Sequence, residues 1–225
     1  MSERIPLAEE PIADPDAVIQ YDKGARLYMT PEYKYFVGKL LSKGIRSGRV
    51  LDIGTGSGLL AIELAKAKNC RFDIVAVDIS PNMIKQAKVN AMLYGVADKI
   101  DFIVDTAAAL PFPDNSFDVV ISYASLHHWF EPVTVFNEAA RVVRESGQVI
   151  IRDNKRVYTS PAWKAVIWCV SRFMNRRHRN NWPKAIMASY TIPEVRELLN
   201  RSRLADYRVK SDFVYIDLCI ESPGE

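Results

Sequence analysis

Apolar and polar residues follow two different periods along this chain, and the periods predict alternating strands and helices. Short apolar runs rich in β-branched residues predict buried strands, whereas an apolar position at every third or fourth residue predicts a helix. The expected strands cover residues 49–53, 72–77, 100–104, 117–123 and 147–152. The expected helices cover residues 59–67, 81–95 and 131–144. This alternation is typical of a parallel sheet covered by helices on both faces.

The two ends of the chain depart from this alternation. Residues 21–43 have helical spacing interrupted at Thr30-Pro31, which predicts two helices. A helix near 193–201 is followed by apolar runs at 207–210 and 213–220, which are close enough to pair as an antiparallel hairpin. We therefore expect an α/β fold with a Rossmann-like doubly wound sheet, mostly parallel with a C-terminal antiparallel hairpin. An N-terminal helical cap and an insertion after strand five complete it.

The length of the chain predicts one domain with additions. Its 225 residues are 48% apolar, enough for one sizeable core. Residues 1–45 are interpreted as an N-terminal arm and helical cap, because the first twenty hold three prolines and no apolar period. Residues 46–225 form the main domain, with an insertion at 155–190 that carries three of the four tryptophans. These aromatic residues either pack the insertion onto the sheet or make it a lid over a pocket.

Charge and cysteine content restrict the partners. The net charge is only +3, with 25% charged residues, so nucleic acid is not an expected partner. Three widely spaced cysteines argue against a disulfide framework and a zinc site, and no metal is expected. No apolar run reaches the roughly 18 residues of a membrane span, and the first residues lack signal-peptide order. We expect a cytoplasmic protein, either monomer or homodimer.

The turn after the first strand carries the most specific motif, Asp52-Ile53-Gly54-Thr55-Gly56-Ser57-Gly58. Glycines there let the backbone turn sharply and approach a ligand closely. The helix that follows directs free N–H groups at that ligand. A nicotinamide or flavin fingerprint would place the third glycine at position 59, which is Leu59. The spacing therefore disfavours a dinucleotide dehydrogenase.

Two further acidic residues end the next two strands. Asp78 follows the second strand, where a carboxylate accepts hydrogen bonds from both ribose hydroxyls of an adenosine. Asp105 follows the third strand, where it is placed to accept the exocyclic amine of adenine. Asp105 alone would be weak evidence, because strand-end Asp residues are common turn starters, and for Asp78 a strand-end cap is the less favoured alternative. Three acids at the carboxyl ends of three successive strands, after this glycine turn, together favour an adenosine ligand.

Residues 49–153 resemble the core of class I S-adenosylmethionine-dependent methyltransferases, and within them the small-molecule group that includes ubiquinone/menaquinone C-methyltransferases. The matching segments are Asp52–Gly58, Val77–Ser80, Asp105-Thr106, Leu110–Val120, Leu126–Trp129 and Arg141–Arg144. One departure is the loop Glu145-Ser-Gly-Gln148, where the family often has Lys-Pro-Gly-Gly. That loop is mostly structural, so the cofactor assignment is little affected.

The resemblance implies S-adenosylmethionine as the cofactor, S-adenosylhomocysteine as the product, and a role for each matching residue. Asp52 would reach the amino group through water. Gly54, Thr55, Gly56 and Gly58 would line the methionine and ribose part, and Asp78 would bind the ribose hydroxyls. Ile79 and Met83 would flank the adenine, and Asp105 and Thr106 would contact its edge. Ser122 and Tyr123 would lie at the methionine end.

The acceptor side is less determined by the sequence. The methyl group of a sulfonium is already activated, so holding the acceptor about 3–3.5 Å from it supplies most of the catalysis. A base is needed only where the acceptor must lose a proton. His127 and His128 follow the fourth strand and are the candidate catalytic bases, with a structural role as the alternative. The candidate acceptor-site residues, with ordinary packing as the alternative, are Tyr21, Tyr28, Asp153 and Asn154.

The sequence thus predicts an S-adenosylmethionine-dependent methyltransferase acting on a small-molecule acceptor by in-line displacement. After the fourth strand it reads Ser122-Tyr-Ala-Ser125, not the Asn/Asp-Pro-Pro-Tyr signature of amino-group methyltransferases. The cysteine pair used on cytosine C5 is also absent. Oxygen, carbon, nitrogen and sulfur acceptors all remain open. The alternatives are an RNA or protein methyltransferase, a non-catalytic S-adenosylmethionine-binding protein, and a nicotinamide-dependent oxidoreductase.

Overall fold

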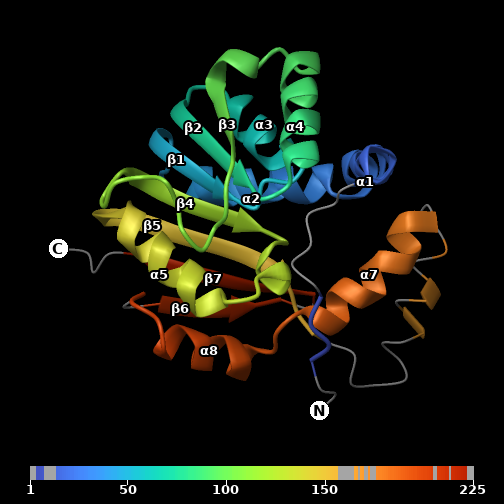
Figure 1. Cartoon of the computed structure of the whole chain (residues 1–225). Helices are drawn as coiled ribbons and strands as arrows, with labels where there is room; N and C mark the ends of the chain where they lie inside the picture. Colours follow the sequence, from blue (N-terminus) through green and yellow to red (C-terminus); the bar gives the residue numbers. More distant parts are fainter. Residues whose placement is uncertain are drawn as a thin grey trace.

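The computed structural model describes residues 4–7, 14–156, 165, 166, 168, 169, 172, 176–204, 207–212 and 214–221. These residues form a seven-stranded sheet with helices on both faces (Figure 1). The strands are β1 (Ser47–Ile53), β2 (Arg71–Asp78), β3 (Ile100–Val104), β4 (Phe117–Tyr123), β5 (Val143–Asn154), β6 (Tyr207–Ser211) and β7 (Tyr215–Glu221). The helices are α1 (Pro15–Tyr28), α2 (Thr30–Ser42), α3 (Leu59–Ala65), α4 (Pro81–Leu93), α5 (Pro132–Val142), α7 (Arg176–Ala188) and α8 (Ile192–Asn200), with short 3-10 turns η1 (Ala97–Lys99) and η2 (Leu126–His128).

The strand order confirms the predicted fold class. The sheet runs β3-β2-β1-β4-β5-β7-β6, with parallel pairing from β3 to β5. Strand β7 pairs antiparallel with both β5 and β6, so the second strand of the hairpin is the one that joins the sheet. A dinucleotide dehydrogenase has a parallel sheet in the order 3-2-1-4-5-6. The antiparallel β7 therefore separates this fold from that class.

Both faces of the sheet are buried under helices. Each central strand contributes to both cores, since successive side chains point to opposite faces. On one face Leu51 of β1 belongs to a core that includes Phe136 of α5 and Leu199 of α8. On the other face Val50 belongs to a core that includes Phe36 of α2 and residues of α3. All three layers are visible in Figure 1. Continuous apolar strands such as β2 are the sequence signature of this double burial.

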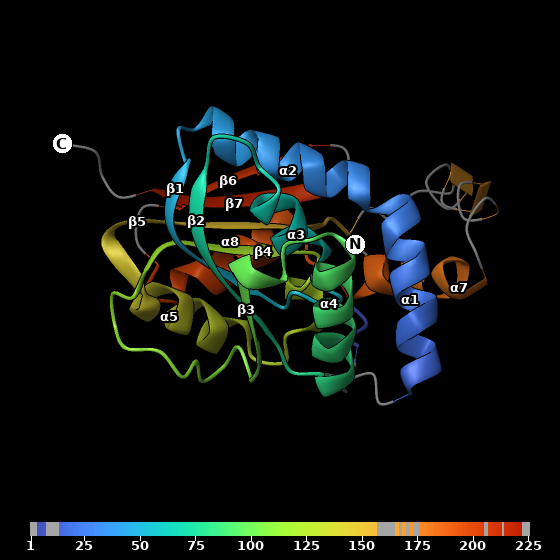
Figure 2. The ribbon, with the colours of Figure 1, turned by 90° about the horizontal axis from the view of Figure 1, so that it is seen from above.

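Helices α1 and α7 cover the edge of the sheet where the parallel strands end, and they lie beside each other (Figures 1 and 2). Helix α1 is tied to α4 by a buried carboxylate: Asp22 accepts hydrogen bonds from Arg26 Nε at 2.8 Å and Asn90 Nδ2 at 2.7 Å. The same Asn90 amide donates to the Ser57 carbonyl at 2.8 Å. This network connects the N-terminal cap to the glycine turn after β1.

Several predicted boundaries differ from the structure, most of all at the N-terminal arm and between α5 and β5. The arm was expected to extend to residue 20, but α1 begins at Pro15, because the Asp14 side chain caps its first turn and accepts from the Asp16 amide. The helix expected at 131–144 ends at Val142. Strand β5 begins at once with Val143, which pairs with Phe117 of β4, rather than at residue 147. The Asp14 cap and the pairing of Val143 with Phe117 determine these boundaries, rather than the spacing of apolar residues.

Candidate functional site

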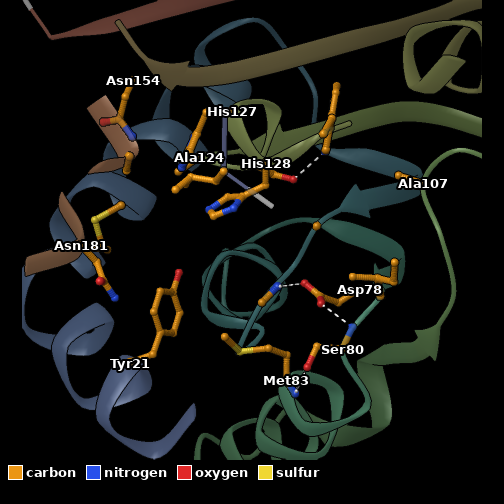
Figure 3. A pocket seen from close by; sticks show the side chains of 18 of the residues that line it. Tyr21, Asp78, Ser80, Met83, Ala107, Ala124, His127, His128, Asn154 and Asn181 are labelled. Atoms are coloured by element: carbon orange, nitrogen blue, oxygen red, sulfur yellow. Dashed lines mark hydrogen bonds between the residues drawn. The ribbon is translucent and has the colours of Figure 1, made fainter. Parts of the chain in front are cut away.

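A cavity of about 510 Å³ lies at the carboxyl ends of the parallel strands (Figure 3). Ligands of open α/β sheets bind at this edge, where loops after neighbouring strands converge. Residues at or after the ends of β1 to β5 form one part of its wall, together with Met83 of α4. The rest of the wall comes from the N-terminal segment, α1, the α1–α2 junction, α7 and β7. We call the first part of the wall the sheet side and the second part the cap side.

The three glycines after β1 all adopt left-handed backbone conformations, but they serve different purposes. A Cβ at Gly54 would lie 2.1 Å from Ser125 Oγ, so this glycine lets two loops of the sheet side meet. Gly56 lines the cavity, and the nearest atoms to an added Cβ would be those of the Tyr21 ring at 3.9 Å. Gly58 does not line the cavity. A Cβ there would come 2.8 Å from Ala87 Cβ, so Gly58 allows α4 to pack closely.

The side chain of Asp52 is buried beside the glycine turn. Its Oδ2 accepts a hydrogen bond from the Thr55 hydroxyl at 2.7 Å. Its Oδ1 is buried and accepts no hydrogen bond from the described residues. The pKa of Asp52 is raised to about 7, mainly by burial; the Thr55 hydroxyl opposes this shift and the neighbouring Asp78 contributes to it. A buried acceptor without a donor is rare in folded proteins and indicates an absent partner.

Asp78 lies at the end of β2 and lines the cavity. Its two oxygens accept hydrogen bonds from the Gly56 amide at 2.8 Å and the Ser80 amide at 2.9 Å. Burial raises the pKa of Asp78 above its ordinary value, while the two amide hydrogen bonds act in the opposite direction. The carboxylate is thereby held in one orientation between the glycine turn and the start of α4. Binding of ribose hydroxyls by Asp78 stays a prediction.

Three of the four residues predicted around adenine lie together on the cavity wall: Ile79, Met83 and Asp105. Thr106 does not line the cavity. Its amide donates to Asp105 Oδ1 at 2.8 Å, so it stabilises the turn that orients Asp105.

At the methionine end, Ser122 and Tyr123 lie outside the cavity wall. Ser122 is fully buried and its hydroxyl donates to the Ile53 carbonyl at 2.8 Å, across β1 and β4. The Tyr123 ring packs edge-on against Tyr33 and Phe36 of α2. The wall is formed instead by the next residues, Ala124 and Ser125.

His127 of η2 forms a buried pair with Asp153 of β5. Its Nδ1 lies 2.7 Å from Asp153 Oδ1, and its backbone N–H donates to Asp153 Oδ2 at 3.1 Å. Both histidines of η2 line the cavity, and their rings lie with centroids 4.3 Å apart and planes tilted by 41° (Figure 3). Burial and the adjacent His127 lower the pKa of His128 to about 4, against the influence of Asp153. His128 is therefore neutral at physiological pH.

The predicted acceptor residues are brought together in part. Tyr21 and Asn154 both line the cavity, as Figure 3 shows. Burial and the carboxylates of Asp78 and Asp22 raise the pKa of Tyr21 to about 12, so its phenol stays protonated. Asp153 does not line the cavity, and its carboxylate contacts His127 instead. Tyr28 is not a wall residue, whereas the next residue, Met29, is.

Sequence reasoning did not identify most of the cap side of the cavity. The residues it missed are Leu7, Met29, Asn181, Lys184, Ala185 and Tyr215. Of the insertion tryptophans that the structure describes, Trp182 lines the cavity and Trp168 is 61% exposed. Trp163, Phe173 and Met174 lie outside the described residues. The amphipathic pattern of the cap helices gave no indication of which of their residues face the sheet.

The described part of the chain holds no group of three histidine, cysteine or acidic side chains arranged to bind a metal ion. Among the same residues, no helix is long and apolar enough to cross a membrane. The three cysteines are free thiols.

Comparison with known proteins gives a family match on the sheet side. A family described as methyltransferase domain matches residues 51–151. The 27-O-demethylrifamycin SV methyltransferase of Amycolatopsis mediterranei is 38% identical over 110 residues, covering 48% of this chain and 40% of the relative. The ubiquinone/menaquinone biosynthesis C-methyltransferase of Hahella chejuensis is 33% identical over 109 residues, covering 48% and 44%. This chain thus spans less than half the length of these relatives.

Solved structures extend the likeness to the whole fold. A Methanococcus maripaludis protein assigned to the S-adenosyl-L-methionine-dependent methyltransferases has a TM-score of 0.73 at 21% identity, covering 100% of this chain and 98% of its own. The plantazolicin methyltransferase, solved with a substrate analogue and S-adenosylhomocysteine, has a TM-score of 0.68 at 15% identity over 92% and 90%. At these identities the likeness establishes the fold alone, including the C-terminal antiparallel strands.

Proposed function

This chain carries a class I S-adenosylmethionine-dependent methyltransferase domain at residues 51–151, and from that premise we propose that it methylates a small-molecule acceptor. S-adenosylmethionine is the cofactor of such domains. The observation that carries the proposal is Asp52 Oδ1, a buried acceptor without a donor beside the glycine turn. The amino group of the cofactor is a cationic donor, and such a donor, directly or through one water, matches a carboxylate oxygen.

The other residues of the sheet side fit the rest of the cofactor. Asp78 would accept the ribose hydroxyls, and its pair of amide hydrogen bonds holds it ready for them. Ile79 and Met83 would flank the adenine, with Asp105 at its edge. When bound, the cofactor supplies an electrophilic methyl group on sulfur. The protein then has to orient the acceptor and exclude water.

The cap side would provide the acceptor site. We propose that residues 1–45 and the insertion at 155–190, through α7, act as a lid over the bound ligands. The support is that Leu7, Tyr21 and Trp182 all line the same cavity as Asp78. One of the two relatives is named for 27-O-demethylrifamycin SV and the other for ubiquinone/menaquinone biosynthesis, which supports a small organic acceptor rather than RNA or protein. We place this activity in the cytoplasm, on a monomer or homodimer.

A transfer assay tests the proposal. The protein is incubated with methyl-labelled S-adenosylmethionine and, separately, with the small-molecule, RNA and protein fractions of a cell extract. We expect label in the small-molecule fraction only, abolished by the Asp78→Ala variant. Label in RNA or protein would contradict the small-molecule assignment. Tight cofactor binding with no transfer to any fraction would support a non-catalytic binding protein instead.

A further inference from the structure

The contacts of Asp153 assign the proton on His127. The Asp153 carboxylate accepts the His127 backbone N–H at 3.1 Å, the Asn154 backbone N–H at 2.5 Å and faces His127 Nδ1 at 2.7 Å. Both backbone groups are obligatory donors, so the carboxylate is the acceptor in this group of contacts. His127 Nδ1 must therefore carry the proton. In the neutral ring the lone pair is then on Nε2.

The pair of His127 and Asp153 is buried by the residues around it. The side chains of His127 and Asp153 are only 4% and 3% exposed. The charged and titratable groups that face them are His128 of η2, Arg4 of the N-terminal segment, Tyr190 before α8, and Tyr21, Tyr215 and Lys184 across the cavity. Arg4 approaches the His127 carbonyl with its guanidinium at 3.3 Å and not the ring. His127 thus remains available as a proton acceptor at the cavity wall.

The wall around His127 restricts the acceptor. Trp129, Ala124, Met29, Leu7 and Tyr215 give it a largely apolar surface. Of the described lining residues, the carboxylates are Asp78 and Asp105, and both belong to the proposed cofactor end. A cationic amine would lose its hydration here without an acid to replace it, which costs several kcal/mol. A neutral molecule with a weakly acidic hydroxyl meets no such cost.

From this geometry we propose that the acceptor is an apolar phenol or enol, that His127 Nε2 takes its hydroxyl proton, and that Asp153 is the positioning residue. The inference rests on the proposed function. The O–H bond breaks with its proton moving to Nε2, and the hydroxyl oxygen forms a bond to the methyl carbon. The carbon–sulfur bond breaks and its electron pair stays on sulfur. The products are a methyl ether, S-adenosylhomocysteine and an imidazolium that Asp153 stabilises until it releases the proton to solvent.

The first test measures the His127 tautomer and is independent of any acceptor or cofactor. The chain has three histidines, so nitrogen-15 NMR of histidine-labelled protein is assigned by comparing the wild type with His127→Gln. We expect a protonated Nδ1 and a bare Nε2 for His127 at neutral pH. Asp153→Asn should produce a mixture of tautomers. A wild-type ring protonated at Nε2 would overturn the inference.

The second test uses 4-nitrophenol, whose anion absorbs visible light, at about pH 6, where the free probe is mostly protonated. In protein saturated with S-adenosylhomocysteine we expect the anion band to appear on binding. His127→Gln should reduce that band about tenfold or more, and Asp153→Asn should reduce it less. The matched control Asp101→Asn, on an exposed residue of β3, should behave as the wild type. With a phenol that the protein methylates, His127→Gln should lower kcat about 10²-fold.

Two results would contradict the proposal. One is a bound probe without the anion band, or a band retained in His127→Gln. The other is preference of the same site for 4-nitrobenzylammonium, because a cation would then be the favoured ligand. Normal S-adenosylhomocysteine binding beside either result would leave the methyltransferase proposal intact and reject the acceptor class alone.

Discussion

The sheet side and the cap side of the cavity are built in different ways. The sheet side is made of strand ends and backbone turns, and most of its residues lie in the segment 51–151 that matches known methyltransferases. The cap side collects side chains from the N-terminal segment, α1, α7 and β7, which are up to two hundred positions apart. Backbone geometry restricts which residues can occupy the sheet side, whereas many apolar side chains can fill the cap side. The proposed function accounts for this division, because the cofactor would contact the sheet side and the acceptor the cap side.

The largest effect should come from removing the carboxylate that anchors the sheet side. Asp78→Ala removes two hydrogen-bond acceptors for ribose hydroxyls, each worth about 1.5–3 kcal/mol to a charged group. S-adenosylhomocysteine affinity should fall about 100-fold or more. Isothermal titration calorimetry measures the change. Asp73→Ala, at an exposed position of the same strand, is the matched control and should bind as the wild type. Equal affinity in both variants would reject the ribose assignment.

Two glycine variants compare a close backbone approach with an open position. Gly54→Ala combines a left-handed φ of 71° with a Cβ 2.1 Å from Ser125 Oγ. The free energy of unfolding should fall by about 3 kcal/mol, from backbone strain and overpacking together. Gly56→Ala has a similar φ but free space around the new Cβ, so about 1 kcal/mol is expected. Urea denaturation measures both, and equal losses would contradict the Ser125 contact.

Affinity for S-adenosylhomocysteine should depend on pH through Asp52. Burial raises the pKa of Asp52 to about 7, so the carboxylate that pairs with the ligand amino group is neutralised below that pH. Affinity should drop up to tenfold per pH unit below 7. Asp78, whose pKa is also raised, acts with the same sign. Asp52→Asn should flatten most of the profile, and an unchanged profile in that variant would refute the role of Asp52.

The same residue should affect stability in the opposite direction. The folded protein keeps the Asp52 proton up to about pH 7, whereas the unfolded chain loses it near 3.8. Between these values the native state binds more protons, so the stability of the ligand-free protein falls as pH rises from about 4 to 7. Urea midpoints across that range should show a smaller fall in Asp52→Asn.

The smallest effect should come from the cap side. Arg4 donates from Nε to the Ala188 carbonyl at 2.6 Å, approaches the His127 carbonyl, and stacks on the Tyr190 ring at 4.1 Å. Arg4→Ala should speed S-adenosylhomocysteine release about fivefold, which corresponds to about 1 kcal/mol. Stopped-flow displacement measures that rate. Arg71→Ala, exposed on β2, is the control. Release unchanged by Arg4→Ala would argue against a closing cap.

The same division explains what could be predicted from the sequence. Strands, the glycine turn and the acids at strand ends are local patterns, so Asp52, Asp78 and Asp105 were placed correctly at the carboxyl edge. The end of β4 was predicted correctly, but the wall residues beside it were expected at Ser122 and Tyr123 and are Ala124 and Ser125. Ala124 adopts a left-handed φ of 54° that an alanine does not signal. Gly58 fits the glycine motif but packs against α4. Its role required knowledge of a neighbour 29 positions away.

The cap residues could not be predicted because their roles depend on tertiary contacts. Leu7 reaches the cavity because its segment is hydrogen-bonded to α7 through the Ile5 amide and the Met187 carbonyl at 3.1 Å. The pairing of His127 with Asp153 likewise depends on β5 lying beside β4. Each residue was a candidate on its own, but the sequence could not show that they form one unit.

The most direct test of the central claim is calorimetric titration of purified, ligand-free protein with S-adenosylhomocysteine and, in parallel, with NADH. The account predicts S-adenosylhomocysteine binding with a dissociation constant of about 1 μM or lower and no heat from NADH. Failure of a folded, ligand-free sample to bind S-adenosylhomocysteine, or binding of NADH in its place, would contradict it.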